Sequence, residues 1–229
     1  MPRGQTQVIL KYEHAAAEEA YDVDGSIVPL FPRTDEQLSV FAEHGLTNRL
    51  TLQAEAAYTR GEDVFSRYDG RGPVALGLRA TVLRTRRTVV SVYAGGVAAG
   101  EGRNAGYAAP SQGEGDVELR LLAGRSGSWR RRPVFAEVQA ARFERSGLPD
   151  EVRLDTTLGV DVTRNWLVLL QNYAGRADGG DAAPMWIKTE ASVVRRVGAW
   201  RVQAGYRRSV GGVNSPLEAG PVVAFWRTF

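Results

Sequence analysis

The sequence predicts an all-β protein, a transmembrane, antiparallel, up-and-down β-barrel of about twelve strands. Three observations support this fold class. Stretches of about ten residues alternate between apolar and polar side chains, and turn residues bound them. The connections between these stretches are alternately long and short. No apolar run approaches the roughly 20 residues that a membrane-spanning helix requires.

Length and composition are compatible with one barrel domain over residues 1–229. Glycine and proline occur in small clusters along the chain, and no segment has the composition of a linker. The chain has no cysteine, which excludes disulfides, cysteine–zinc sites and thiol catalysis. Its net charge of +3 is too small and too scattered to predict a nucleic-acid partner.

The segment 151–162 is the clearest strand. Successive side chains of a strand point to opposite faces, so residues two apart share a face. One face of this segment is apolar and carries Val152, Leu154, Leu158, Val160 and Val162. The other face is polar and carries Arg153, Asp155, Thr157 and Asp161. A helix would scatter both sets around its circumference.

The same alternation predicts strands near residues 5–13, 35–44, 49–59, 74–84, 88–99, 115–125, 133–144, 151–162, 166–176, 185–196, 199–209 and 220–229. The longer, polar connections are 14–34, 60–73, 100–114, 145–150, 177–184 and 210–219. Short turns at 45–48, 85–87, 126–132, 163–165 and 197–198 lie between them. An even-stranded outer-membrane barrel has short periplasmic turns, longer extracellular loops and both termini in the periplasm. A soluble sandwich has no reason to keep this order.

The two faces of each strand suit two different solvents. A membrane barrel turns its apolar face to lipid and its polar face inward, whereas a soluble barrel does the reverse. In a membrane barrel the inward face carries cations and anions in nearly equal numbers, which can form cross-strand ion pairs. The predicted pore-lining residues are Lys11, Glu55, Arg79, Glu118, Arg120, Glu137, Arg153, Asp155, Asp161, Lys188, Glu190, Arg201 and Arg207. The alternative is that these charges cover the wet exterior of a soluble barrel.

Aromatic side chains near strand ends predict girdles at the two membrane interfaces. Trp166 and Trp200 open strands after short turns, at the proposed periplasmic rim. The full predicted girdle comprises Tyr12, Tyr58, Trp166, Tyr173, Trp186, Trp200 and Tyr206. The alternative is that strands are rich in aromatic residues in any β-protein.

The last strand ends the chain on an aromatic residue. Its Phe225 and Phe229 resemble the C-terminal signature that Gram-negative outer-membrane barrels present to the barrel-assembly machinery. The segment Glu43-His-Gly-Leu-Thr-Asn-Arg-Leu-Thr-Leu52 is similar to turns in proteobacterial barrels described as transporters of aromatic compounds. The chain therefore resembles a small Gram-negative outer-membrane barrel, although Arg227 stands where an apolar residue is usual.

This resemblance implies a location in the outer membrane, with outer-membrane lipid, lipopolysaccharide and the assembly machinery as partners. It assigns no functional residue. The first residues lack the apolar segment of a signal peptide, so we expect a mature form from which the signal is absent.

Little in the chain indicates catalysis. We expect His14 and His44 on opposite sides of the membrane, without a serine placed to form a hydrolase. The Asp/Gly segments that begin at Asp22 and Asp178 lack a full set of calcium ligands, which favours ordinary turns. The glycine-rich segment 100–106 lacks the ending of a phosphate loop and is predicted to be flexible. We therefore expect no enzymatic activity, metal or cofactor.

Three functional hypotheses follow. The first is a channel or transporter for small polar or ionic solutes, because about twelve strands lie between a filled eight-stranded barrel and an open sixteen-stranded one. The second is a plugged barrel whose extracellular loops bind a protein partner, lipopolysaccharide or an exported polymer, with segment 14–34 as the plug or partner loop. The third is a soluble barrel that binds a lipophilic ligand. Arginines 130–132 either contact anionic headgroups or form a solvated turn.

Overall fold

The computed structural model describes residues 1–229 and folds into one antiparallel sheet of thirteen strands. The strands are β1 (Thr6–Tyr21), β2 (Ile27–Gly45), β3 (Leu50–Glu62), β4 (Arg67–Arg84), β5 (Thr88–Ala98), β6 (Gly115–Trp129), β7 (Arg132–Ser146), β8 (Glu151–Asp161), β9 (Trp166–Ala177), β10 (Met185–Val197), β11 (Trp200–Val213), β12 (Ser215–Pro216) and β13 (Ala219–Thr228). The structure contains no helix long and apolar enough to cross a membrane.

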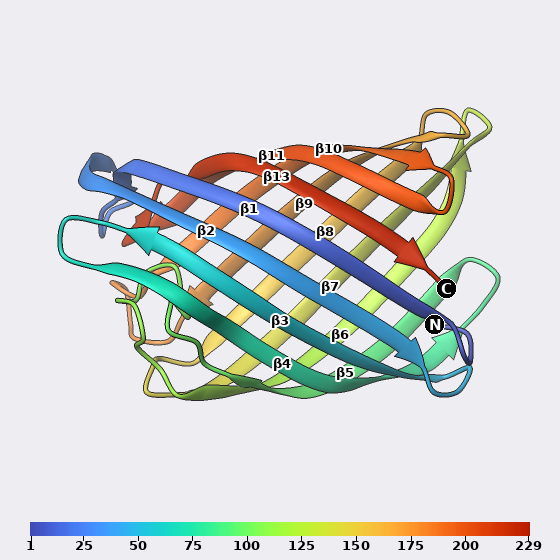
Figure 1. The fold of residues 1–229 in the computed structure, drawn as a ribbon, viewed down its shortest axis with the longest axis horizontal. Coiled ribbons are helices and arrows are strands. Elements are labelled where there is room, and N and C mark those ends of the chain that lie inside the picture. The colour runs from blue at the N-terminus through green and yellow to red at the C-terminus, as the bar shows by residue number, and fades with distance from the viewer.

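The sheet closes on itself because β1 pairs with β2 on one side and with β13 on the other (Figure 1). All other neighbours except β12 follow the order of the chain, so a ring of twelve strands results. The short strand β12 pairs only with Ala20 and Tyr21 at the end of β1, and it lies outside this ring. The predicted fold class, a closed antiparallel barrel of about twelve strands, is confirmed.

Both chain ends lie at the same end of the barrel, which we call the termini end (Figure 1). The connections at this end are short, and the hairpin between β6 and β7 turns on Arg130 and Arg131 alone, with φ angles of 49° and 65°. The opposite end, which we call the loop end, carries the longest connection, residues 99–114 between β5 and β6. The predicted alternation of short turns and longer loops therefore holds in outline.

Two of the predicted long loops are mostly strand. Segment 14–34 continues β1 and β2 as a paired hairpin. In its turn, the carboxylate of Asp22 accepts hydrogen bonds from the N–H groups of Asp24 and Ser26 at 2.9 and 2.8 Å. Segment 60–73 likewise contains the ends of β3 and β4. Charged residues and prolines interrupt the apolar alternation in these segments, so the sequence pattern does not predict strands there. A strand outside a membrane needs only its ladder of backbone hydrogen bonds and no apolar alternation. Segment 14–34 is thus neither a loop nor a plug.

The middle of the barrel has an apolar outer wall. Val152, Leu154 and Leu158 are exposed on it, to 48%, 49% and 48%. Between them, Arg153 and Asp155 face the lumen, where Arg153 binds the fully buried Glu151 and Asp155 pairs with Tyr173. This is the orientation that the sequence predicts for a barrel in a membrane.

One part of the inner wall departs from the predicted pattern. Leu167, Leu169 and Val194 form a buried apolar cluster with Trp226 packed against it. Leu167 pairs directly with Asp161 and Val194, so the cluster lies on the inner face near the termini end. The expectation that aliphatic side chains all face outward is therefore wrong at this site.

Candidate functional site: the lumen

The predicted pore-lining residues all lie on the inner face of the barrel. Paired residues of neighbouring strands share a face, and the register carries this face from strand to strand. Glu190, for example, pairs with Gln171 and Arg207, and Asp155 pairs with Gln139 and Tyr173. Whether these side chains govern permeation stays a prediction, but their position along the lumen is clear.

One ion-pair cluster joins β1, β10 and β11. Arg207 donates to Glu190 from Nε at 3.1 Å and from Nη2 at 2.7 Å, and it also contacts Glu13. Lys11 lies 3.1 Å from Glu13. The guanidinium of Arg207 stacks on the ring of Tyr173 at 4.4 Å. The cluster has two cations and two carboxylates and is electrically neutral.

A second cluster joins β6, β7 and β8. The fully buried carboxylate of Glu151 binds Arg145 and accepts from Nε of Arg153 at 2.8 Å. Nε of Arg145 donates to Asp116 at 3.0 Å. Arg153 also lies over the ring of Phe143 at 4.1 Å. This cluster is neutral as well.

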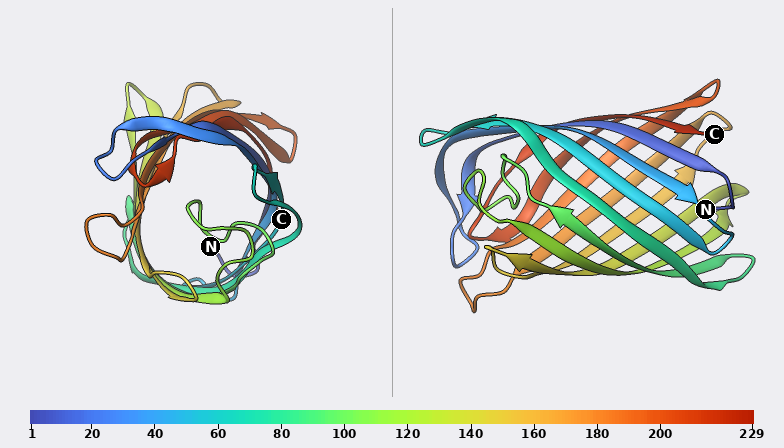
Figure 2. Two further views of the ribbon diagram at one scale, coloured as in Figure 1. Left: turned by 90° about the vertical axis from the view of Figure 1, so that its left-hand side faces the viewer. Right: turned by 60° about the horizontal axis from the view of Figure 1, so that its bottom comes forward.

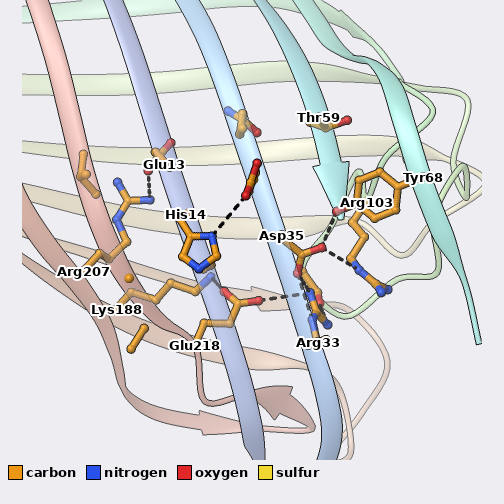
Figure 3. A pocket seen from close by; sticks show the side chains of 17 residues that line it. Glu13, His14, Arg33, Asp35, Thr59, Tyr68, Arg103, Lys188, Arg207 and Glu218 are labelled. Carbon is orange, nitrogen blue, oxygen red and sulfur yellow. Dashed lines mark hydrogen bonds and ion pairs between the residues drawn. The ribbon is translucent and has the colours of Figure 1, made fainter. Parts of the chain in front are cut away.

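The third cluster lines a cavity of about 170 Å³ at the loop end (Figure 3). Arg33 contacts Asp35 at 2.6 Å and Glu218 at 3.2 Å, and Lys188 also binds Glu218. Arg103 is a further cation of this cluster, and it forms ion pairs with the carboxylates of both Asp35 and Asp63. Three cations again meet three carboxylates.

The remaining lumenal cations are paired singly, with two exceptions. Three simple pairs are Arg120–Glu118, Arg79–Glu43 and Arg196–Asp161. Arg84 and Arg201, both near the termini end, have no carboxylate within 4 Å. Three lumenal carboxylates also have no cation within that distance, namely Glu55, Glu137 and Asp155. Negative charge is therefore the surplus in the middle of the lumen.

Residues 99–114 fold back into the loop end of the barrel, inside the ring of strands (Figure 2). Arg103 is the main fastening of this loop. Its Nε donates to Asp35 at 3.0 Å, its Nη2 donates to Asp63, and its guanidinium lies 5.8 Å from the centre of the Tyr68 ring. One loop side chain thus binds two different parts of the wall.

Strand residues fasten the other half of the same loop. Nη2 of Arg145 donates to the carbonyl oxygen of Asn104 at 3.0 Å. The hydroxyl of Tyr107 donates to Glu151 at 2.9 Å, and its ring packs on Trp186 with centroids 6.0 Å apart. The loop therefore narrows the lumen, and segment 100–106, which the sequence predicts to be flexible, is held to the wall at Arg103 and Asn104.

Two residues in the contacts that hold the loop, Asp63 and Tyr107, have shifted pKa values that suit their hydrogen bonds. Burial opposes ionisation of Asp63, but hydrogen bonds from the N–H of Phe65 and from Arg103 outweigh it and lower the pKa of Asp63 to about 2. Burial and the nearby Glu151 carboxylate raise the pKa of Tyr107 well above its usual value. At neutral pH, Asp63 is an anion and Tyr107 is a phenol that can donate.

Aromatic rings lie flat on the inner wall where glycines leave room. The ring of Tyr93 covers Gly77 and Gly95, and a Cβ at either position would collide with its hydroxyl. The ring of Trp186 covers Gly175 in the same way. These close approaches require the absence of a side chain and keep the rings out of the axial space.

Two residues of the predicted girdle are not in it. Tyr173 stacks under Arg207, and Trp186 packs on Tyr107, so both rings face the lumen. Together they line a cavity of about 260 Å³ beside the folded-in loop. The alternation of the strands explains the error. Trp186 pairs with Gly175 on the neighbouring strand, and Tyr173 lies two residues before Gly175, so both side chains point inward. The other girdle residues are exposed on the outer wall, namely Tyr12, Tyr58, Trp166, Trp200 and Tyr206.

The residues that resemble a C-terminal assembly signature lie on β13, the last strand, and at the chain end that pairs with β1. Phe225 and Phe229 are exposed, and Phe229 exchanges backbone hydrogen bonds with Thr6 of β1 at 2.8 and 3.2 Å. Arg227, the unusual residue of this strand, lies over the rings of Trp200 at 5.0 Å and Phe229 at 4.6 Å. Recognition of this strand by an assembly machinery stays a prediction.

The two histidines lie at different ends of the barrel. His14 is on β1 rather than in a loop, and its Nδ1 is 3.7 Å from Glu36. His44 lies near the termini end, where its Nδ1 is 2.9 Å from the hydroxyl of Thr6.

Sequence reasoning missed the residues that fasten the loop. Arg103 and Tyr107 are the one cation and the one aromatic residue of segment 99–114, which was the available signal. Of their wall partners, Tyr68 and Glu151 fall at strand ends, where the alternation is weakest, whereas Asp35 lies within β2, beside the charged and proline-containing part of that strand.

Comparison with known proteins supports the architecture. No protein-family model and no curated protein sequence matches this chain. Among solved structures, an outer-membrane channel from Pseudomonas putida F1 has a TM-score of 0.78 at 15% identity, covering 100% of this chain and 97% of that chain. The NanC porin has a TM-score of 0.59 at 6% identity, covering 96% and 98%. The KdgM porin has a TM-score of 0.56 at 8% identity, covering 96% and 99%. These likenesses show that the chain has the outer-membrane β-barrel fold.

Proposed function

We propose that this protein is an outer-membrane channel that passes small polar or ionic solutes through a narrow, charged lumen. The closed twelve-stranded ring, the apolar outer wall and the porins of similar fold support this proposal. The folded-in loop 99–114 and the wall charges together set the width of the passage. Rings of charged side chains are a common basis of ion selectivity in pores.

One observation carries the proposal further, to the sign of the preferred solute. Each ion-pair cluster of the lumen is neutral, so the unpaired side chains dominate the field along the axis. Glu55 and Asp155 both lie near the Arg120–Glu118 pair, and their carboxylates have no cation of their own. We therefore propose that the middle of the lumen favours cations over anions.

Planar lipid bilayers test both parts. The purified protein should give discrete single-channel currents, and a KCl gradient should give a reversal potential of the sign expected for cation preference. The double variant Glu55→Gln/Asp155→Asn should shift this potential toward the anion side. Glu62→Gln, which removes an exposed carboxylate of the loop end, should leave it unchanged. A bilayer that stays silent contradicts the channel, whereas conductance with anion preference contradicts only the assignment of charge.

We propose further that the termini end is periplasmic and the loop end extracellular. The chain has no cysteine, so single cysteines can report the topology. Intact cells that produce Gly180→Cys should react with a membrane-impermeant maleimide, and those with Gly198→Cys at the termini end should react only after lysis. The reverse pattern would invert the proposed orientation. Fractionation to the outer membrane and a heat-dependent gel shift would support the location.

The second candidate is a plugged barrel that binds a protein partner, lipopolysaccharide or an exported polymer at the loop end. The inward position of loop 99–114 favours this candidate specifically. A silent bilayer together with co-purification of a partner would support it. Conductance that appears only after release of the loop, as in Arg103→Gln, would also support it over an open channel.

A further inference from the structure

The termini end carries an unusual set of charges on its turns. Arginines are frequent there, namely Arg49, Arg86, Arg87, Arg130, Arg131 and Arg164. None of these turns carries an acidic residue. The connections of the loop end are rich in carboxylates instead, among them Asp22, Asp63, Asp150 and Asp178. The charge of the barrel surface is therefore polarised along its axis.

Three arginines of the termini end lie over exposed tryptophans. Arg195 pairs in register with Trp166 and lies 5.4 Å from its ring centre. Arg227 pairs in register with Trp200 and lies 5.0 Å from its ring centre, so the same arrangement recurs on another strand pair. The third pair is Arg130, which lies 4.9 Å from the ring centre of Trp129. We call these three arginines and three tryptophans the arginine–tryptophan belt.

The belt faces outward, directly beside the apolar wall. Its tryptophans are exposed to between 40% and 58%. Arg195 follows the inward-facing Val194 and so points out of the barrel. Tryptophan prefers such a position between hydrocarbon and water because its body is apolar and its N–H is polar.

None of the belt arginines has a carboxylate within 4 Å. Outward arginines of the loop end behave differently, since Arg60 binds Glu36 at 2.7 Å and Arg142 binds Asp178 at 2.9 Å. A guanidinium forms two parallel hydrogen bonds with a phosphate, and a ring beneath it fixes its orientation. The belt thus offers oriented phosphate-binding forks at the height where a bilayer has its headgroups.

We propose that the arginine–tryptophan belt binds the phosphates of anionic glycerophospholipids in the leaflet at the termini end. The proposal rests on the membrane placement proposed above. A lipid is favoured over a soluble anion because the belt tryptophans are exposed on the outer wall and the belt continues directly into its lipid-facing apolar part. The belt provides cationic groups for anionic headgroups in one leaflet only, because the loop end carries carboxylates instead.

Tryptophan quenching by brominated lipids tests the proposal in mixed vesicles. Brominated phosphatidylglycerol should quench the fluorescence of the belt tryptophans more strongly than brominated phosphatidylcholine does at equal lipid content. One arginine at an anionic surface changes affinity by a factor of about five, so the wild-type preference should be at least about fivefold at low salt. Salt at about 1 M should reduce it, because the screening length is then only about 3 Å.

The variant Arg130→Gln/Arg195→Gln/Arg227→Gln should lose this preference. The matched control Arg60→Gln/Arg67→Gln/Arg176→Gln removes three exposed arginines of the loop end and should keep it. Equal quenching by both lipids in the wild type, or equal loss in both variants, would overturn the proposal. So would displacement by millimolar glycerol phosphate or polyglutamate, which would indicate a soluble phosphate or an acidic protein. A chain that fails to enter vesicles shows no heat-dependent gel shift, which separates failure of the membrane placement from failure of the belt.

Discussion

The arginines of the lumen and those of the belt are the same residue type in opposite situations. In the lumen, Arg145, Arg153 and Arg207 each meet one or two carboxylates, and Glu151 and Glu190 are completely buried among them. On the outer wall at the termini end, Arg195 and Arg227 meet aromatic rings and no carboxylate. An enclosed site must compensate charge with its own side chains, whereas an interface can leave compensation to its surroundings.

Glu151→Gln should show the largest effect, because it tests the enclosed half of this comparison. The substitution leaves Arg153 without a carboxylate and Arg145 with Asp116 alone. Breaking one side of a buried ion pair costs about 3–5 kcal/mol. We expect a loss of this order in the free energy of unfolding, measured by urea titration of the protein in lipid vesicles.

Glu55→Gln is the matched control for that experiment. Glu55 is also a lumenal carboxylate, but no cation lies within 4 Å of it, so its removal should leave stability unchanged or slightly raised. Equal destabilisation by the two substitutions would mean that the ion pairs do not hold the wall together.

Arg103→Gln should have the next largest effect, because this cation belongs to a loop rather than to the wall. Hydrogen bonds to charged groups contribute about 1.5–3 kcal/mol each, so the population of released loop should rise at least about tenfold. Single-channel conductance should rise accordingly. Arg176→Gln, which contacts only the carbonyl of Gly180, serves as the control. Unchanged currents in Arg103→Gln would show that the loop does not obstruct the passage.

Acid should release the same contact at a defined pH. The pKa of Asp63 is lowered in the folded protein from 3.8 to about 2. Its stabilising contribution is therefore fully present above about pH 4 and is lost as the pH falls through about 2. We expect the conductance of the wild type to differ from that of Asp63→Asn above pH 4, to lose about half of this difference near pH 2, and to converge with the variant at lower pH. A difference that is undiminished at pH 2 would assign the effect to another group.

Much of the fold could be predicted because each strand alternates in the same phase over the apolar band. Val152, Leu154 and Leu158 had to face one solvent, and Arg153 and Asp155 another. The same parity puts the charges that are predicted to line a pore on the inner face of the barrel. Tyr173 and Trp186 occupy inward positions by the same alternation, although their aromatic character predicts a place in the girdle.

The rest of the site could not be predicted, because it depends on contacts between distant segments. Arg103 meets Asp35 and Asp63 across 68 and 40 residues of chain, and no local pattern encodes that approach. The inward cluster of Leu167, Leu169 and Val194 reads locally like any lipid-facing set. Only the register of the closed barrel assigns these side chains to the inside.

Arg195→Gln should have the smallest effect, and it tests the open half of the comparison. An exposed cation over a ring contributes about 0.5–1 kcal/mol, and Arg195 has no carboxylate that its loss would leave unpaired. The free energy of unfolding should fall by less than about 1 kcal/mol in vesicles of phosphatidylcholine. In vesicles that contain phosphatidylglycerol the loss should be larger, because the phosphate contact disappears as well. The same small loss in both lipids would mean that Arg195 responds to its tryptophan alone, and the contrast between lumen and belt would then reduce to one of burial.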